Sequence, residues 1–280
     1  VGKIISVVNR KGGVGKTTLS VGLAEAFVSE YSSKTIVVDL DPQASATRFL
    51  LNQDGRFEKA IDDGKTLTGF LKAAEGGVAT ASDETVQRML HIIKDRSEVD
   101  LALVANSDDY WDYEIEQIRS GCADALQNRI AALLKLLADR YDYIIVDCPP
   151  GQSLASEASA KVSDLVLCPI TPERMAVWGK ELLETYLKRV APLVKVRFVV
   201  SRKQSSRLAD KFVDEIQKSG GLLPTPGGGS RDFVTLSQSK QFQDRLEIDR
   251  INLSLQSLWG GKAVKEIKAA AKAVKEELGV

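Results

Sequence analysis

A glycine-rich stretch near the start of the chain, VVNRKGGVGKTT (7–18), carries two lysines, Lys11 and Lys16. In loops of this kind backbone N–H groups surround phosphate oxygens, a lysine reaches the terminal phosphates, and the following hydroxyl binds Mg²⁺. The strict pattern G-x-x-x-x-G-K-[ST] is broken, because Arg10 occupies the position of its first glycine. The residues predicted to contact phosphate are Lys11, Gly12, Gly13, Val14, Gly15, Lys16, Thr17 and Thr18.

Three aspartates stand at the ends of apolar strands. Asp39 and Asp41 alternate at the end of KTIVVDLD (34–41), so their side chains face the same side. Asp147 ends the apolar run of YDYIIVDCPP (141–150), where a buried carboxylate without a ligand would carry a desolvation cost. A carboxylate at this position can orient the shell of a Mg²⁺ ion through water. Asp147 is therefore predicted to belong to a metal site.

These side chains need a sheet whose strands end at one edge. Strands are predicted at 3–9, 34–41, 99–106, 141–150, 164–171 and 194–201. Helical spacing of apolar residues predicts helices after the glycine-rich loop, at 123–141 and at 176–190. Alternating strands and helices imply right-handed crossovers. The predicted fold is α/β, a doubly wound, mostly parallel sheet flanked by helices, in a single domain over residues 1–280.

Three other segments have distinct patterns. Residues 44–100 are predicted to be mostly helical with loops, and the Gly/Pro-rich residues 218–232 are predicted to form a surface loop. The segment 261–279 is an amphipathic helix without Trp or Phe on its apolar side. We expect this helix to pack against the sheet rather than to lie on a membrane. Its apolar seam is Val264, Ile267, Ala271, Val274 and Leu278.

Composition limits the classes of partner and compartment. Basic and acidic residues balance at 38 each, so a nucleic-acid or membrane surface would have to be a local patch. Cys122, Cys148 and Cys168 are odd in number and widely spaced, which favours free thiols in the cytoplasm. No apolar run approaches the length of about 18 residues needed to span a bilayer, and no signal-peptide pattern opens the chain. We expect no stable membrane insertion.

Three motifs together resemble one family. KGGVGKTT (11–18) is similar to the deviant Walker A box of the ParA/MinD superfamily of P-loop ATPases. VVDLDPQASAT (37–47) resembles that family's second acidic segment, and YDYIIVDCPPG (141–151) resembles its Walker B strand and switch region. The resemblance covers most of the chain and weakens after about residue 200. It is closest to partition proteins of the ParA/Soj type.

The resemblance implies roles for the charged residues. Lys16 would contact phosphates in its own subunit, whereas Lys11 would cross the interface of an ATP-sandwich homodimer to the nucleotide of the other subunit. Thr17, Asp39 and Asp147 would hold Mg²⁺ or its shell. Asp41 would position the attacking water of a slow ATPase, although it could instead cap the turn before Pro42. The implied cofactors are ATP and Mg²⁺.

The resemblance also implies partners. Family members bind nonspecific DNA, and a ParB-like or other adaptor protein stimulates hydrolysis to position a plasmid, a chromosome region or a protein cargo on the nucleoid. The residues predicted to contact DNA are Arg202, Lys203, Arg207 and Arg231, for which a solvated charged face is the alternative. Adenine contacts are expected from SRKQ (201–204) and from residues 224–231.

Several alternatives remain open from the sequence. A MinD-like regulator that cycles on a membrane is one, and an iron–sulfur electron donor that uses Cys122 and Cys148 is another. The acidic and aromatic cluster DDYWDYEIEQ (108–117) could be a partner or dimer surface, or Trp111 could pack beneath its helix.

Overall fold

The computed structural model describes residues 1–51, 55–75, 83–93, 99, 101–227, 232–237 and 260–280. The predicted DNA contact Arg231, and residues 228–231 of the predicted adenine loop, lie outside the described residues.

The described strands join one eight-stranded sheet in the order β3-β4-β2-β5-β1-β6-β7-β8. Only the β3–β4 pair is antiparallel among these neighbours. The doubly wound, mostly parallel fold predicted from the sequence is thereby confirmed. The strands are β1 (Lys3–Val7), β2 (Thr35–Asp39), β3 (Leu90–Ile93), β4 (Leu101–Val104), β5 (Tyr143–Asp147), β6 (Leu165–Ile170), β7 (Lys195–Lys203) and β8 (Thr235–Ser237).

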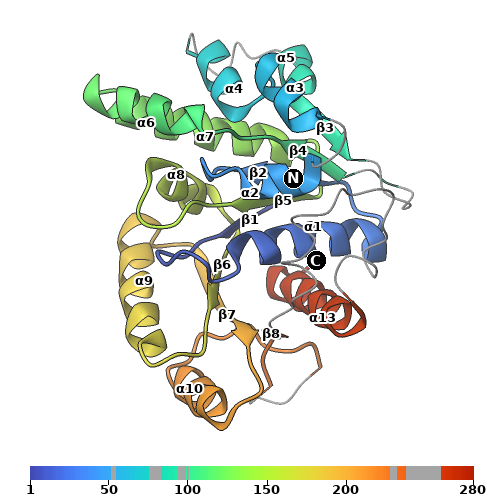
Figure 1. Cartoon of the computed structure of the whole chain (residues 1–280), viewed down its shortest axis with the longest axis vertical. Coiled ribbons are helices and arrows are strands. Elements are labelled where there is room, and N and C mark those ends of the chain that lie inside the picture. Colours follow the sequence, from blue (N-terminus) through green and yellow to red (C-terminus); the bar gives the residue numbers. More distant parts are fainter. Residues whose placement is uncertain (52–54, 76–82, 94–98, 100, 228–231, 238–259) are drawn as a thin grey trace.

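Helices cover both faces of the sheet (Figure 1). Helices α1, α2, α3 and α13 pack on one face, and α4, α6, α7, α8, α9 and α10 on the other. Alternate residues of one strand serve the two cores: Ile144 of β5 belongs to one and Ile145 to the other. This explains why the strands are continuously apolar.

The described helices have the following bounds: α1 (Lys16–Tyr31), α2 (Ser45–Leu51), α3 (Arg56–Asp62), α4 (Leu67–Ala73), α5 (Asp83–Met89), α6 (Asp109–Arg119), α7 (Ala123–Ala138), α8 (Leu154–Val162), α9 (Ala176–Val190), α10 (Arg207–Lys218) and α13 (Gly261–Leu278).

Two short strands differ from the sequence expectation. The segment LHII of β3 lies within the region predicted to be helical with loops, and β8 has three residues. Both are too short to show a period, and both owe their form to pairing with β4 and β7 at the sheet edges. The Gly/Pro-rich segment is a surface loop only in part, because Leu223 is fully buried and its N–H donates to the carbonyl of Phe198.

Helix α13 packs in the core, as expected from its composition. Val264, Ile267 and Val274 are buried against the layer that contains α1, and Lys268 pairs with Glu30 of α1 at 2.7 Å. The apolar face that could have met a lipid surface is therefore already covered by protein. Nor does any helix in the described ranges combine the length and apolar character that a bilayer crossing requires.

Replacing Ile267 with alanine tests whether α13 is part of the core. Because Ile267 is 2% exposed, Ile267→Ala should lower the free energy of unfolding by about 2–4 kcal/mol. Urea denaturation would measure this loss, with Lys265→Ala on the exposed side of the same helix as the control, expected to change stability by less than about 0.5 kcal/mol. Equal stability of the two variants would contradict the core assignment.

Candidate functional site

The glycine-rich loop joins the central strand β1 to α1. Gly13 and Gly15 have φ angles of 70° and 91°, in the left-handed region that disfavours other residues. Gly15 is the N-cap of α1, and no side chain caps this end of the helix. The first N–H groups of α1 and its positive dipole end can therefore receive an anion, which confirms the strand, loop and helix arrangement predicted from the sequence.

Lys16 is held inside the loop. It is 7% exposed, and its Nζ donates to the carbonyl oxygen of Lys11 at 3.3 Å. Burial lowers the pKa of Lys16, while the nearby carboxylates of Asp147 and Asp41 oppose this shift. An ammonium group with so little water around it gains from an anionic ligand such as phosphate, since folding has already removed most of its hydration.

Asp147 lies fully buried at the end of β5, where two hydroxyls bind it. Thr17 Oγ1 donates to its Oδ2 at 2.7 Å, and Ser20 Oγ donates to its Oδ1 at 2.9 Å. Burial raises the pKa of Asp147 despite these two hydrogen bonds, and the negative charge of Asp41 adds to the rise. A cation at this position would relieve the cost of ionising Asp147.

Asp39 lies opposite Asp147 in the parallel ladder of β2 and β5. Its Oδ2 accepts hydrogen bonds from the backbone N–H and the hydroxyl of Thr47, each at 2.8 Å, and its Oδ1 accepts from the N–H of Asp41 at 3.0 Å. Burial raises the pKa of Asp39, and the charge of Asp147 raises it further. Asp39 thus fixes the turn that follows β2, and it lies next to Asp147, a residue of the predicted metal site.

Asp41 makes a turn contact of the kind that the sequence left as an alternative. Its Oδ1 accepts from the N–H of Gln43 at 2.9 Å, which leaves Oδ2 outside this bond. The side chain is 8% exposed, and burial raises the pKa of Asp41. Capping uses one oxygen only, so the contact and a role in orienting water are compatible.

The oxygen ligands beside the loop suit Mg²⁺, which also binds phosphate and water, better than they suit a metal ion bound by protein ligands alone. In the described part of the chain no three His, Cys, Asp or Glu side chains converge on one point. Mg²⁺ is commonly bound by one or two carboxylates or hydroxyls together with phosphate oxygens and water. The Thr17 hydroxyl and the Asp147 carboxylate, 2.7 Å apart beside the loop, meet that description, with Asp39 behind them.

Lys11 lies on the exposed side of the loop. Asn9 supports the loop there, because its Oδ1 accepts from the N–H of Lys11 at 2.8 Å and its Nδ2 donates to the carbonyl of Pro169 at 2.7 Å. The ammonium group of Lys11 forms an ion pair with Glu173, which precedes α9. In this single chain Lys11 is therefore held by its own subunit.

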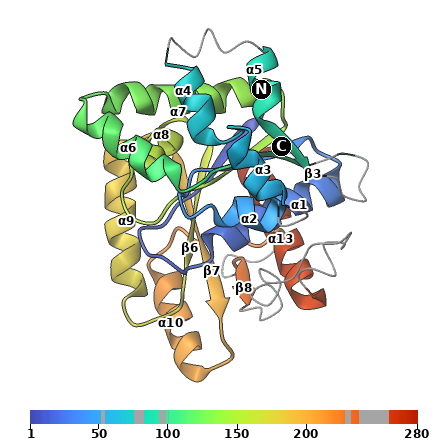
Figure 2. The ribbon, with the colours of Figure 1, turned by 45° about the horizontal axis from the view of Figure 1, so that its top comes forward.

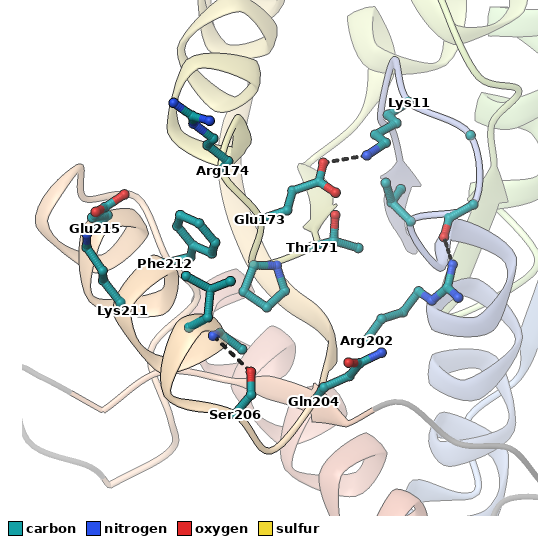
Figure 3. A pocket seen from close by; sticks show the side chains of 16 residues that line it. Lys11, Thr171, Glu173, Arg174, Arg202, Gln204, Ser206, Lys211, Phe212 and Glu215 are labelled. Carbon is teal, nitrogen blue, oxygen red and sulfur yellow. Dashed lines mark hydrogen bonds and ion pairs between the residues drawn. The ribbon is translucent and has the colours of Figure 1, made fainter.

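A cavity of about 1060 Å³ opens beside the loop, between residues 171–174, residues 202–206 and α10. Figure 3 shows Lys11 and Glu173 pointing toward each other on one side, while Arg202 reaches the loop from the other. The guanidinium of Arg202 donates to the carbonyl of Gly13, and the hydroxyl of Ser201 donates to that of Val14 at 2.6 Å. Two residues of the predicted adenine segment thus hold the phosphate loop.

The three predicted DNA contacts that the structure describes, Arg202, Lys203 and Arg207, do not form one free basic cluster. Arg202 is turned toward the loop, and Lys203 pairs with Asp210 at 3.0 Å. Arg207 is exposed at the start of α10, a helix that carries three basic and three acidic residues. The DNA assignment therefore remains a prediction, supported best at Arg207.

The cysteines are separate, free thiols. Cys122 is exposed at the start of α7, whereas Cys148 and Cys168 are fully buried. Burial raises the pKa of the Cys148 thiol to about 12. Because Cys148 has no exposed surface, it is not placed to share a cluster with a second subunit, which disfavours the iron–sulfur alternative.

Three residues of the site were not assigned roles from the sequence. Ser20 could have been found, since it lies one helical turn after Thr17 and shares its face of α1. Thr47 lies within the second acidic segment but shows its role only once the turn after β2 brings it back to Asp39. Nothing in the local sequence of Glu173 connects it with Lys11, which lies 162 residues away.

Comparison with known proteins agrees with this geometry. A family model described as "AAA domain" matches residues 2–198. The chromosome partitioning protein ParA of Myxococcus xanthus is 31% identical over 224 residues, which cover 78% of this chain and 71% of that protein.

Two solved structures share the fold. A putative plasmid partition protein of Borrelia burgdorferi, bound to AMPPNP, superposes with a TM-score of 0.74 at 19% identity and covers 99% of this chain and 100% of its own. A cobyrinic acid a,c-diamide synthase of Mycobacterium smegmatis, with an ATP analogue and magnesium, gives a TM-score of 0.67 at 20% identity and covers 100% and 98%.

The two buried carboxylates predict a pH dependence. The folded state keeps Asp39 and Asp147 protonated above the ordinary carboxyl pKa of about 4, so it binds more protons than the unfolded state and loses stability as pH rises. The melting temperature of the nucleotide-free protein should fall as pH rises from about 5 toward 8. Asp147→Asn should flatten this slope, because it removes one of the two titrating carboxyl groups. The variant should keep its local structure, because the hydroxyls of Thr17 and Ser20 can also form hydrogen bonds with an amide.

The matched control is Asp124→Asn, at an exposed carboxylate at the start of α7, which should keep the wild-type slope. Scanning calorimetry across this pH range would decide the matter, and an unchanged slope in Asp147→Asn would contradict the assignment.

Proposed function

Because the chain belongs to the ParA/MinD superfamily of P-loop ATPases, we propose that it is a slow Mg²⁺-dependent ATPase whose nucleotide state positions or segregates a cargo. The observation that carries the proposal is the group formed by Lys16, Thr17 and Asp147 at the free N-terminus of α1. The nucleotides bound in the two related structures, AMPPNP and an ATP analogue with magnesium, support the choice of ATP.

The residues of this chain divide the work. The N–H groups of residues 12–18 and the ammonium of Lys16 bind the phosphates. Thr17 and Asp147 would hold Mg²⁺, which would supply positive charge beside the phosphate oxygens. Asp41 orients the attacking water. The cavity between residues 171–174 and α10 takes the base and ribose, with Arg202 and Gln204 at its edge. Burial raises the pKa of Asp41, but a carboxylate remains a weak base toward water. We therefore expect Asp41 to orient the water rather than to deprotonate it, and hydrolysis to be slow.

Dimer formation is the second part of the proposal. The side chain of Lys11 forms no hydrogen bond within the loop, and it is 57% exposed. It can therefore reach a second subunit once its ion pair with Glu173 is broken. The ATP-bound homodimer then carries Lys11 of each subunit to the nucleotide of the other. The ion pair with Glu173 competes with that contact.

Variants of the two lysines test this division. Lys16→Ala should abolish ATP binding measured by calorimetry, because it removes the buried cation of the phosphate site. Lys11→Ala should bind ATP within about threefold of wild type but should not dimerise, as measured by light scattering. Glu173→Gln is the matched variant on the other side of the ion pair and should dimerise at lower protein concentration. Equal loss of ATP binding in both lysine variants would contradict the assignment of Lys11 to the partner's site.

Replacing Asp41 with alanine tests the hydrolytic step. Asp41→Ala should bind ATP and dimerise, and its turnover should fall by about 10²-fold or more because the attacking water is no longer oriented. Phosphate release measures the rate. Wild-type turnover would leave Asp41 with its turn contact to Gln43 alone.

The DNA partner is tested by binding to nonspecific duplex DNA with ATP, ADP or no nucleotide, at low and moderate salt. We expect binding only with ATP, with a steep loss as salt is raised. Arg207→Ala should reduce the slope of log affinity against log salt concentration by about one, as expected for the loss of one phosphate contact. No binding in any state, with ATP-dependent dimers intact, would exclude DNA and leave the ATPase proposal standing.

A further inference from the structure

Helix α6 exposes an apolar stripe to solvent. Trp111 is 58% exposed and Ile118 is 52% exposed, and Ile115 lies between them at helical spacing and is partly exposed. Trp111 therefore does not pack beneath its helix, which was one of the two interpretations of this cluster. An exposed tryptophan beside an exposed isoleucine is more typical of a docking surface than of a solvated helix.

The stripe cannot turn inward, because the opposite side of α6 is anchored. Tyr110 and Tyr113 are buried there, and Arg129 of α7 donates to the hydroxyl of Tyr113 at 2.8 Å and to Gln117 Oε1 at 2.6 Å. These bonds fix the rotation of the helix about its axis. The exposure of Trp111 is thus a consequence of the packing on its other side.

The surroundings of the stripe are acidic. Asp108, Asp109, Asp112 and Glu116 are exposed on α6 or directly before it, and Arg119 is the single basic residue of the helix itself. Asp108, Asp112 and Glu116 make no ion pair with any side chain in the part of the chain that the structure describes. This surface repels nucleic acid and anionic lipid and attracts cationic groups.

Helix α6 also contacts the segment that follows Asp147. Glu114, 8% exposed, accepts from the N–H of Leu154 at 3.1 Å, at the first residue of α8. Between Asp147 and α8, the N–H of Gly151 donates to the carbonyl of Arg10 in the phosphate loop at 2.9 Å. Figure 2 shows α6 at the periphery of the molecule, beside α8. A molecule on the outer side of α6 would thus be connected to the phosphate loop through two hydrogen bonds and the short segment 151–154 between them.

We propose that this face of α6 docks a basic amphipathic segment of a partner protein, with an apolar side chain on Trp111 and Ile118 and lysines or arginines on Asp112 and Glu116. Burying an aromatic anchor inside a charged rim is a frequent way for short segments to bind. Arginine also stacks well on tryptophan. Docking itself needs no nucleotide; only the identification of this partner with the one that stimulates hydrolysis rests on the proposed function.

The probes are two synthetic helical peptides with the same leucine pattern, one rich in lysine and arginine and the other rich in glutamate. Calorimetry on the full chain without nucleotide should detect the cationic peptide alone, with an affinity that falls as salt is raised. Trp111→Ser should weaken its binding by about tenfold or more. Trp178→Ser is the matched control, since Trp178 is also 58% exposed but lies on α9, and it should bind as the wild type does.

A charge exchange gives a second, independent test. The double variant Asp112→Lys with Glu116→Lys should lose the cationic peptide and gain the anionic one. Unchanged binding of the cationic peptide in this variant and in Trp111→Ser would overturn the proposal, as would absence of binding at low salt. A concentration-dependent dimer that Trp111→Ser abolishes would also overturn it, because a second copy would then cover the face.

Hydrogen exchange tests the connection to the site. Binding of the cationic peptide should slow amide exchange at the start of α8, residues 154–156, because α6 holds Glu114 against Leu154. Binding without this protection would contradict the connection. Peptide binding and hydrogen exchange are both measured without ATP hydrolysis. A failure of the docking proposal is therefore distinguishable from a failure of the proposed ATPase.

Discussion

The site depends on one constraint, which is the presence of two buried carboxylates at neighbouring strand ends. The register of β2 with β5 sets Asp39 opposite Asp147, and both are fully buried. Burial and mutual repulsion disfavour ionisation of the pair. The hydroxyls of Thr17, Ser20 and Thr47 offset part of this cost, and the buried ammonium of Lys16 offsets a smaller part at Asp147. Lys16, Thr17 and Ser20 lie at the start of α1 and Thr47 lies in α2, so the constraint ties the two strand ends to two separate helices.

The same arrangement prepares the site for an added cation. A metal ion between Thr17, Asp147 and phosphate oxygens would remove the repulsion that the protein alone only reduces. The uncapped N-terminus of α1 gives the complementary preference for the anion. Nucleotide and metal are therefore expected to bind together, each lowering the electrostatic cost of the other. A switch between nucleotide states needs this kind of differential binding.

The loop is also held from outside its own sequence. Ser201 and Arg202, at the end of β7, bond the carbonyls of Val14 and Gly13, and Gly151 bonds the carbonyl of Arg10. The phosphate loop is thus attached both to the segment that lines the cavity and to the segment that leads to α8 and α6. A change in nucleotide state could therefore be transmitted through these hydrogen bonds to the cavity or to the surface of α6.

The sequence by itself determined the central strands and the strand, loop and helix that form the candidate phosphate site, because these elements depend on local patterns. Apolar strands ending in aspartate, a loop with Gly13 and Gly15, and the helix from Lys16 follow from short-range sterics and periodicity. The short edge strands β3 and β8 were missed, since pairing rather than propensity forms them.

Only the tertiary structure decided which distant groups meet. Glu173 reaches Lys11 across 162 positions, Arg202 turns to the loop instead of to solvent, and Trp111 is exposed because Arg129 anchors the other side of α6. Long-range contacts of this kind leave no period or spacing in the sequence, because they depend on which strands lie next to each other in the sheet.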